Sequence, residues 1–141
     1  MKMPKLEEIR AAIARDWPGD PVAELCERII AFLIEVPPQE LRQLSPTTFA
    51  RAVGIDAPNE LLLKAITILS ATSVKILEPH FLFVDDDEKE YEVTRESLRQ
   101  AQRQGTLEHP NTGNEVADYA PHILPYFSPT EEFMQLRGAA A

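Results

Sequence analysis

The sequence has 141 residues, 44% of them hydrophobic and 26% charged, which is the composition of a folded domain and excludes a disordered chain. Its net charge of −9 disfavours binding to phosphate backbones and anionic lipid head groups, and its longest apolar run, residues 29–34, is too short to span a bilayer. The length predicts a single domain over residues 1–141, and the lack of a signal-peptide pattern predicts a cytoplasmic location.

The N-terminal part predicts two helices separated by proline and glycine. In the first, Leu6, Ile9, Ile13 and Trp17 recur at spacings of three and four and form one apolar stripe. A second helix begins where Asp20 provides an N-cap and a proline follows, and it is expected to end at residues 36–38. The chain's single cysteine lies within this helix. It can form no disulfide within the chain, and we expect it in the core.

Two further helices follow in the middle of the chain. Ser45 and the proline after it predict the start of a third helix, which should stop at Gly54. A fourth helix should begin near Asn59 and continue through residue 72. Leucine, isoleucine and alanine make this fourth helix apolar on most sides, which suits a buried helix or one covered by another protein.

After residue 72 the apolar pattern shortens to that of strands, and residues 80–84 and 90–94 predict a β-hairpin. Its tip is acidic, and residues 73–94 carry a net charge of −5. Asp85, Asp86, Asp87 and Glu88 are therefore candidate contacts for a basic partner, although a solvated hairpin tip explains the same pattern. A surface helix over residues 95–104 should follow, capped by a threonine and closed by a glycine.

A small residue, Ala50, is followed four residues later by Gly54, and a second helix begins shortly afterwards. This pattern resembles a helix-turn-helix, because a small residue lets two helices approach and glycine adopts the left-handed turn. With the hairpin that follows, residues 22–94 resemble a winged helix. In members of this family that bind DNA, the helix after the turn reads bases and the wing contacts phosphates.

The sequence departs from the DNA-binding pattern at both of these elements. The helix after the turn contains no arginine, and the expected wing is acidic. Nucleic-acid binding is therefore not expected, and Leu61 and Lys64 become candidate contacts for a protein partner. A DNA-binding transcription regulator of the winged-helix type stays open as the alternative.

No sequence motif for catalysis, cofactor binding or metal binding stands out. There is no glycine-flanked serine and no glycine-rich phosphate loop. His109, Asp118 and His122 are possible metal ligands by type, but they lack a recognised ligand spacing, and the acidic tip lacks the pattern of a calcium loop. We predict no catalytic residue, cofactor or metal; a small hydrolase is the weakest alternative.

The C-terminal part, residues 106–137, predicts a small hairpin, an extended arm and a short helix. Residues 110–113, PNTG, have the composition of a tight turn. Prolines should keep the following arm extended, and Tyr126 and Phe127 are too apolar to remain in water. They should pack on this chain, or else on a second copy or a partner. Ser128 and Glu131 have the spacing of a capping box for the last helix.

Together these patterns predict an α+β fold, with N-terminal helices, a helix-turn-helix-like core, a β-hairpin wing, and a C-terminal hairpin with an extended arm. The expected function is that of a non-enzymatic interaction or adaptor subunit that binds a protein partner or associates with itself.

Overall fold

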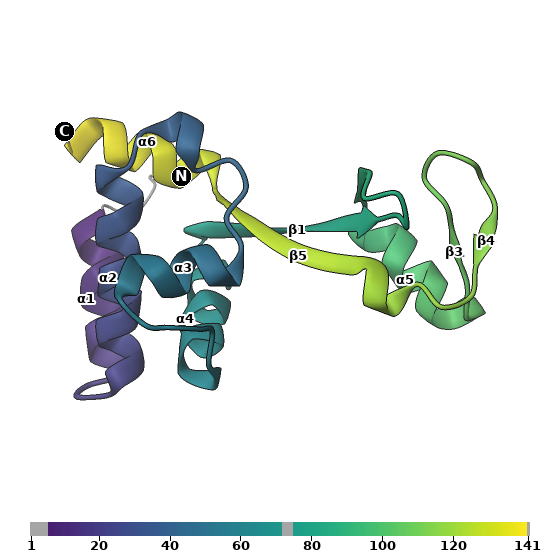
Figure 1. Ribbon diagram of the computed structural model, residues 1–141. Helices are drawn as coiled ribbons and strands as arrows, with labels where there is room; N and C mark the ends of the chain where they lie inside the picture. Colours follow the sequence, from purple (N-terminus) through teal and green to yellow (C-terminus); the bar gives the residue numbers. More distant parts are fainter. Residues whose placement is uncertain (1–5, 72–74, 141) are drawn as a thin grey trace. The chain divides into compact units, whose positions relative to one another are not determined.

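The computed structural model describes residues 6–71 and 75–140 (Figure 1). The fold is α+β, as predicted, and the described residues form six α-helices, a three-stranded antiparallel sheet and a two-stranded hairpin. The α-helices are α1 (Leu6–Asp16), α2 (Pro21–Glu35), α3 (Pro46–Val53), α4 (Glu60–Ser70), α5 (Arg95–Gln104) and α6 (Glu131–Ala140). The sheet has the order β2 (Glu90–Val93), β1 (Leu77–Val84), β5 (Ile123–Pro129), and the hairpin joins β3 (Leu107–Glu108) to β4 (Glu115–Val116).

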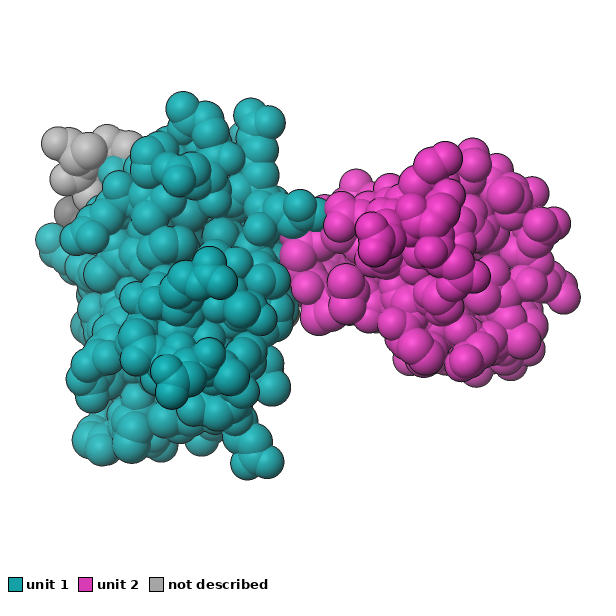
Figure 2. Space-filling view, viewed as in Figure 1, with its two compact units in different colours: residues 1–78, 127–141 teal, residues 79–126 magenta. Residues whose placement is uncertain are grey.

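The chain divides into two compact units, which Figure 2 shows in different colours. Unit 1 consists of residues 1–78 and 127–141, and unit 2 consists of residues 79–126. The chain passes from one unit to the other twice, between Glu78 and Pro79 and between Tyr126 and Phe127. None of the described helices is both long and apolar enough to cross a membrane.

The predicted helix starts are confirmed by their caps. The side chain of Asp20 accepts a hydrogen bond from the Val22 amide at 2.9 Å, and Asn59 accepts one from the Leu62 amide at 2.8 Å. Ser45 and Thr94 cap α3 and α5 in the same way. Each cap satisfies an amide that the helix leaves without an internal partner, so these short polar residues fix where the helices begin.

Unit 1 is built around α2, which packs against α1, α3 and α4. One side of α2 is fully buried, and Cys26 lies within it, as expected. The first helix places its predicted apolar stripe in the same core, and α4 contributes Leu62 and Leu69, neither of which is exposed. This packing of four apolar helix faces forms the larger of the two cores.

Between α3 and α4 the chain turns as the sequence predicts. Gly54 has a φ of +82°, the left-handed conformation that favours glycine, and the Ile55 amide donates to the Ala50 carbonyl at 2.9 Å. Ala50 is buried, and α3 packs on α4. Residues 54–59 form the connection.

The last part of the chain packs into unit 1 through Phe127. Its amide and carbonyl both pair with Leu44, at 2.7 and 2.8 Å, and its ring meets the edge of Phe49 at a centroid distance of 6.1 Å. The prediction that Ser128 caps the last helix is wrong. Thr130 is the residue whose hydroxyl accepts the Phe133 amide at 3.1 Å, and it also donates to the Lys75 carbonyl at 2.5 Å.

Unit 2 contains both hairpins and α5. In the first hairpin Phe83 pairs with Tyr91 and Val84 with Glu90, and the turn between them is the acidic tip. The predicted PNTG hairpin is confirmed as β3 and β4, with Gly113 at a φ of +76°. The buried apolar core of this unit is small and consists of four side chains, Phe83, Val93, Ala101 and Leu107.

The extended arm is interrupted where the sequence predicts continuous extension. Ala120–His122 forms a short 3₁₀ helix, η2, before β5 begins. Pro121 does not prevent it, because proline is tolerated in the first turn of a helix, where an amide has no internal acceptor. A second short 3₁₀ helix, η1, covers Pro38–Glu40 and was not predicted.

The packing of Phe127 predicts a specific loss of stability in unit 1. Because the ring is partly buried against the core, Phe127→Ala should lower the free energy of unfolding by about 2 kcal/mol, or Tm by roughly 10 °C. Fluorescence of Trp17, the only tryptophan, reports this core. Tyr126→Ala is the matched control and should shift this signal much less. A Tm of the unmutated protein that rises with concentration would instead indicate that the arm packs on a second copy.

Candidate functional site

The most specific cluster of polar side chains in unit 2 centres on His109. Its Nε2 lies 2.7 Å from Oδ2 of Asp85, at the start of the acidic hairpin tip. Only 7% of the His109 side chain is exposed, whereas 29% of the Asp85 side chain is, so this hydrogen bond is partly buried. The two residues are 24 positions apart, and the bond ties the tip of the first hairpin to the turn of the second.

The other ring nitrogen of His109 is an acceptor. Its Nδ1 receives the amide of Asn111 at 3.1 Å and that of Thr112 at 3.2 Å. A nitrogen that accepts two N–H groups carries no proton, so the proton of the neutral ring resides on Nε2 and is donated to Asp85. The backbone turn thus fixes both the tautomer and the orientation of the ring.

Aromatic rings enclose this histidine. Phe83 and Tyr91 both meet it edge to face, at centroid distances of 5.1 and 5.3 Å. Phe83 is buried and Tyr91 packs on the same small core. The imidazole therefore extends the apolar core of unit 2 while its two nitrogens satisfy three polar groups.

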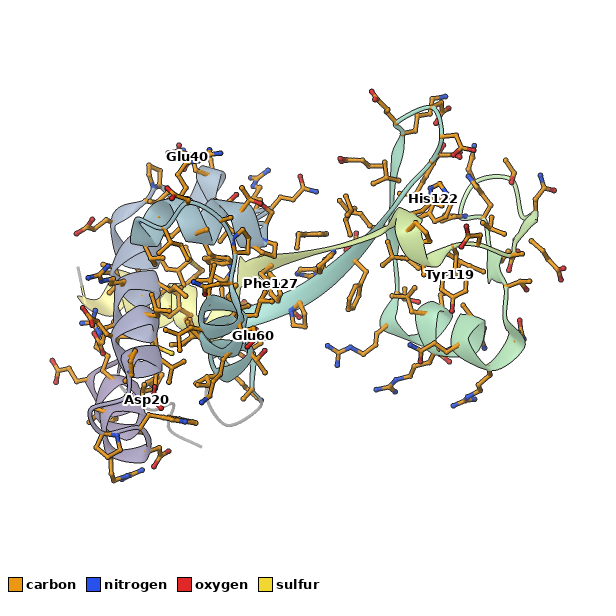
Figure 3. All side chains as sticks on the ribbon, turned by 60° about the horizontal axis from the view of Figure 1, so that its bottom comes forward. Asp20, Glu40, Glu60, Tyr119, His122 and Phe127 are labelled. Atoms are coloured by element: carbon orange, nitrogen blue, oxygen red, sulfur yellow. The ribbon has the colours of Figure 1, made fainter. Side chains whose placement is uncertain are left out.

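His122 also contacts Phe83, and its hydrogen bond requires the opposite tautomer. Its ring stacks on Phe83 at 5.4 Å, and its Nδ1 lies 2.8 Å from the Val84 carbonyl, to which it must donate. Its Nε2 is 3.9 Å from Oδ1 of Asp86. Figure 3 labels His122, the last residue of the short helix η2, and Tyr119, which directly precedes this helix.

The electrostatics of the cluster centre on Asp85. The hydrogen bond from His109 and, second, that from the Asp86 amide at 2.8 Å hold the pKa of the Asp85 carboxyl below its ordinary value. Both donors favour the ionised form, and they outweigh the opposing effect of partial burial. Asp85 is therefore a permanent acceptor at neutral pH.

This arrangement does not provide a catalytic base. A histidine that works with a carboxylate must keep its second nitrogen available to a nucleophile or substrate, as in serine hydrolases. In His109 that nitrogen is occupied by two backbone amides. A metal would need the same lone pair. Among the described residues, no three His, Cys, Asp or Glu side chains come together as a metal centre requires.

Cys26 is the remaining classical nucleophile, and it is inert for a physical reason. Its side chain is inaccessible, and burial, together with the nearby charge of Glu27, raises the pKa of the thiol to about 11. The reactive form of cysteine is the thiolate, which is negligible under these conditions.

The structure separates the residues predicted from the acidic tip. Asp85 faces inward to His109, whereas the side chain of Asp86 is 93% exposed. Asp87 lies 3.7 Å from the Lys89 ammonium, and Glu88 holds the turn with a φ of +66°. Asp86, Asp87 and Glu88 are thus the acidic side chains of the tip that a partner could reach.

The other predicted contacts fall into two groups. Leu61 and Lys64 lie on α4, where Lys64 is exposed and Leu61 is half-buried. The adjacent aromatics point to different units: Phe127 packs in unit 1, while the Tyr126 hydroxyl donates to Glu92 at 3.2 Å and its ring stacks on His80. Burial, followed by the Glu92 contact, raises the pKa of Tyr126.

Comparison with protein-family models, with curated proteins and with solved structures finds no match to this chain. Its function must therefore be argued from the residues themselves.

The hydrogen bonds of the two histidines predict opposite tautomers. Long-range ¹H–¹⁵N correlation spectra near pH 7.5 should show the proton of His109 on Nε2 and that of His122 on Nδ1. His80 provides an internal reference in the same spectrum. A His109 ring protonated on Nδ1, or one exchanging between tautomers, would contradict the geometry described above.

The Asp85 carboxylate predicts acid sensitivity of unit 2. Because its pKa is lower in the folded protein, the folded state binds fewer protons than the unfolded chain, and acid favours unfolding. The contribution of Asp85 to the free energy of unfolding is complete at pH values above about 3.9, the ordinary pKa of aspartate. It is lost as the pH falls through the lower pKa that Asp85 has in the folded protein. Asp85→Asn keeps an acceptor for His109 but should flatten the pH dependence of urea unfolding, followed by the His109 signals.

Asp86→Asn is the control for that experiment, because its carboxylate is exposed and should leave the acid slope unchanged. Equal slopes in the Asp85→Asn variant and the unmutated protein would show that the His109 bond does not favour the ionised form.

Proposed function

We propose that this chain is a non-enzymatic interaction or adaptor subunit whose unit 1 uses a winged-helix-like scaffold to bind a protein. The observation that carries the proposal is the outward face of α4. Leu63 is 47% exposed there, beside the half-buried Leu61. On the helix that follows the Gly54 turn, an exposed leucine beside a half-buried one favours contact with an apolar protein surface.

The polar groups of this face do not suit a nucleic acid. The exposed side chains of α4 include one cation, Lys64, and one anion, Glu60, so their charges cancel. Leu61 and Lys64 line a shallow hollow of about 520 Å³ together with Asn59 and Glu60 at the start of the helix. Base reading needs hydrogen-bond donors in this position and phosphates need several cations.

The candidate catalytic groups support the non-enzymatic part of the proposal. His109 has no available ring nitrogen, and Cys26 is held as a buried thiol. Both therefore act as structural residues. A protein partner remains the ligand class that best fits the surface.

The proposal is tested by placing a charge on the outward face of α4 that carries Leu61 and Leu63, which we call the leucine face. Leu63→Glu should abolish capture of a specific partner from lysate and should weaken the purified complex by at least tenfold, because a carboxylate would be buried at the interface. Ala14→Glu adds the same charge at an exposed position of α1 and should have no effect. Both variants should retain Tm within a few degrees.

A gel shift with duplex DNA tests the alternative of a transcription regulator. The acidic charge predicts no binding tighter than roughly 10⁻⁴ M at physiological salt. Submicromolar, sequence-dependent binding that Leu63→Glu abolishes would overturn the adaptor proposal and favour the regulator.

A further inference from the structure

The positive charge of unit 2 is gathered on one helix. Residues 79–126 carry ten Asp and Glu against four Lys and Arg, a net charge of −6. Three of the four cations, Arg95, Arg99 and Arg103, lie on α5 at intervals of four residues. This spacing places them in one row along a helix face, and all three are exposed.

These arginines are not neutralised within the described chain. No ion pair or hydrogen bond of their guanidinium groups is found among the described residues, although the unit has an excess of carboxylates. Glu96, the only acidic residue of α5, is not paired with Arg95 or Arg99. Like charges one turn apart repel each other, so the row favours an external anion.

Part of the row lines a groove with an apolar side. Arg95, Arg99 and Gln102 belong to α5, and Leu98 lies between them. Residues from β1, η2 and β5 complete the groove, whose volume is about 520 Å³. The residues contributed by these other segments are Phe81, Tyr119, Ala120 and Ile123.

The apolar side of the groove is continuous with the core. Leu98, Tyr119 and Ile123 are half-buried and pack against the small cluster around Phe83. A surface anchored in this way keeps its shape, which reduces the entropy lost when a ligand binds. Figure 3 labels Tyr119 next to η2.

We infer that this groove binds an extended acidic peptide segment of another protein, in which two carboxylates flank an apolar residue. Arginines one turn apart on a helix are about 6 Å apart, and side chains two apart on a strand are separated by about 6.6 Å. Two such carboxylates can each form paired hydrogen bonds with a guanidinium. The residue between them points the other way, toward Phe81, Tyr119 and Ile123.

A peptide suits the surface better than a nucleic acid. A phosphate backbone would extend beyond the two arginines over a unit with a net charge of −6, whereas a short segment needs only the groove. The inference rests on the proposed function only in that the ligand is a protein. The groove belongs to unit 2, and the leucine face of α4 belongs to unit 1.

The test uses the full chain and a fluorescein-labelled peptide of sequence GSGEFEGSG. Fluorescence anisotropy should show saturable binding, and ¹⁵N spectra should show the largest shifts at Arg95, Arg99 and Tyr119. A peptide with glutamine in place of both glutamates should bind at least tenfold more weakly. A peptide with alanine in place of phenylalanine should bind at least threefold more weakly. Absence of saturable binding at millimolar peptide, or equal binding of the glutamine peptide, would overturn the inference.

The protein variants locate the binding on α5. Arg95→Gln with Arg99→Gln should weaken binding of the peptide at least tenfold, while Arg103→Gln, on the same helix but outside the groove, should change it less than threefold. Retention of the His109 Nε2–H signal establishes that unit 2 is folded. Equal affinity of the double variant and the unmutated protein would place the peptide elsewhere and overturn the assignment.

Two further measurements separate the peptide from other ligands. Tighter binding of a 20-nucleotide oligo-dT than of the peptide would make the row a nucleic-acid surface. A dimer in light scattering that the double arginine variant dissociates would make a second copy the ligand. Either result overturns the inference. Leu63→Glu should leave peptide binding unchanged, so failure at α4 and failure at α5 give different results.

Discussion

Unit 2 depends on the hydrogen bond between His109 and Asp85. Only four apolar side chains form its fully buried core, which is little for a segment of this size. His109 compensates because one ring satisfies a carboxylate and two backbone amides while it packs against two aromatic rings. Leaving such groups buried without partners would cost more than the bonds themselves contribute. The hydrogen bonds of His109 therefore hold the tip of the first hairpin against the turn of the second.

The same hydrogen bonds explain why the cluster of His109 and Asp85 is not a reaction centre. In a catalytic pair the carboxylate orients the imidazole and leaves its far nitrogen to the substrate. In this chain the turn after β3 supplies two amides to that nitrogen. Histidine and aspartate, which are catalytic in other proteins, are structural here because backbone amides occupy the ring nitrogen that a substrate would need. The distinction comes from hydrogen-bond geometry and not from composition.

Local chemistry made much of the fold predictable. Asp20, Ser45, Asn59 and Thr94 start helices because each satisfies amides within its own first turn, which sequence spacing alone determines. Between Ser128 and Thr130 the spacing favoured the wrong residue, since Thr130 is selected by its contact with Lys75, 55 positions away. The bond from His109 to Asp85 was unpredictable for the same reason. A signal for the α5 row was present, however, in arginines four residues apart.

The distribution of charge gives the two surfaces different selectivity. The face of α4 proposed to bind a protein has no net charge, so the proposal implies an affinity that comes from apolar burial and is insensitive to salt. The α5 row is a local positive surface on an acidic unit, so long-range repulsion acts against every polyanion before contact is made. A short acidic segment experiences the same repulsion, but it gains paired hydrogen bonds and an apolar contact within one groove. The excess of carboxylates therefore favours a compact acidic motif over an extended phosphate backbone, although both carry the charge that arginine attracts.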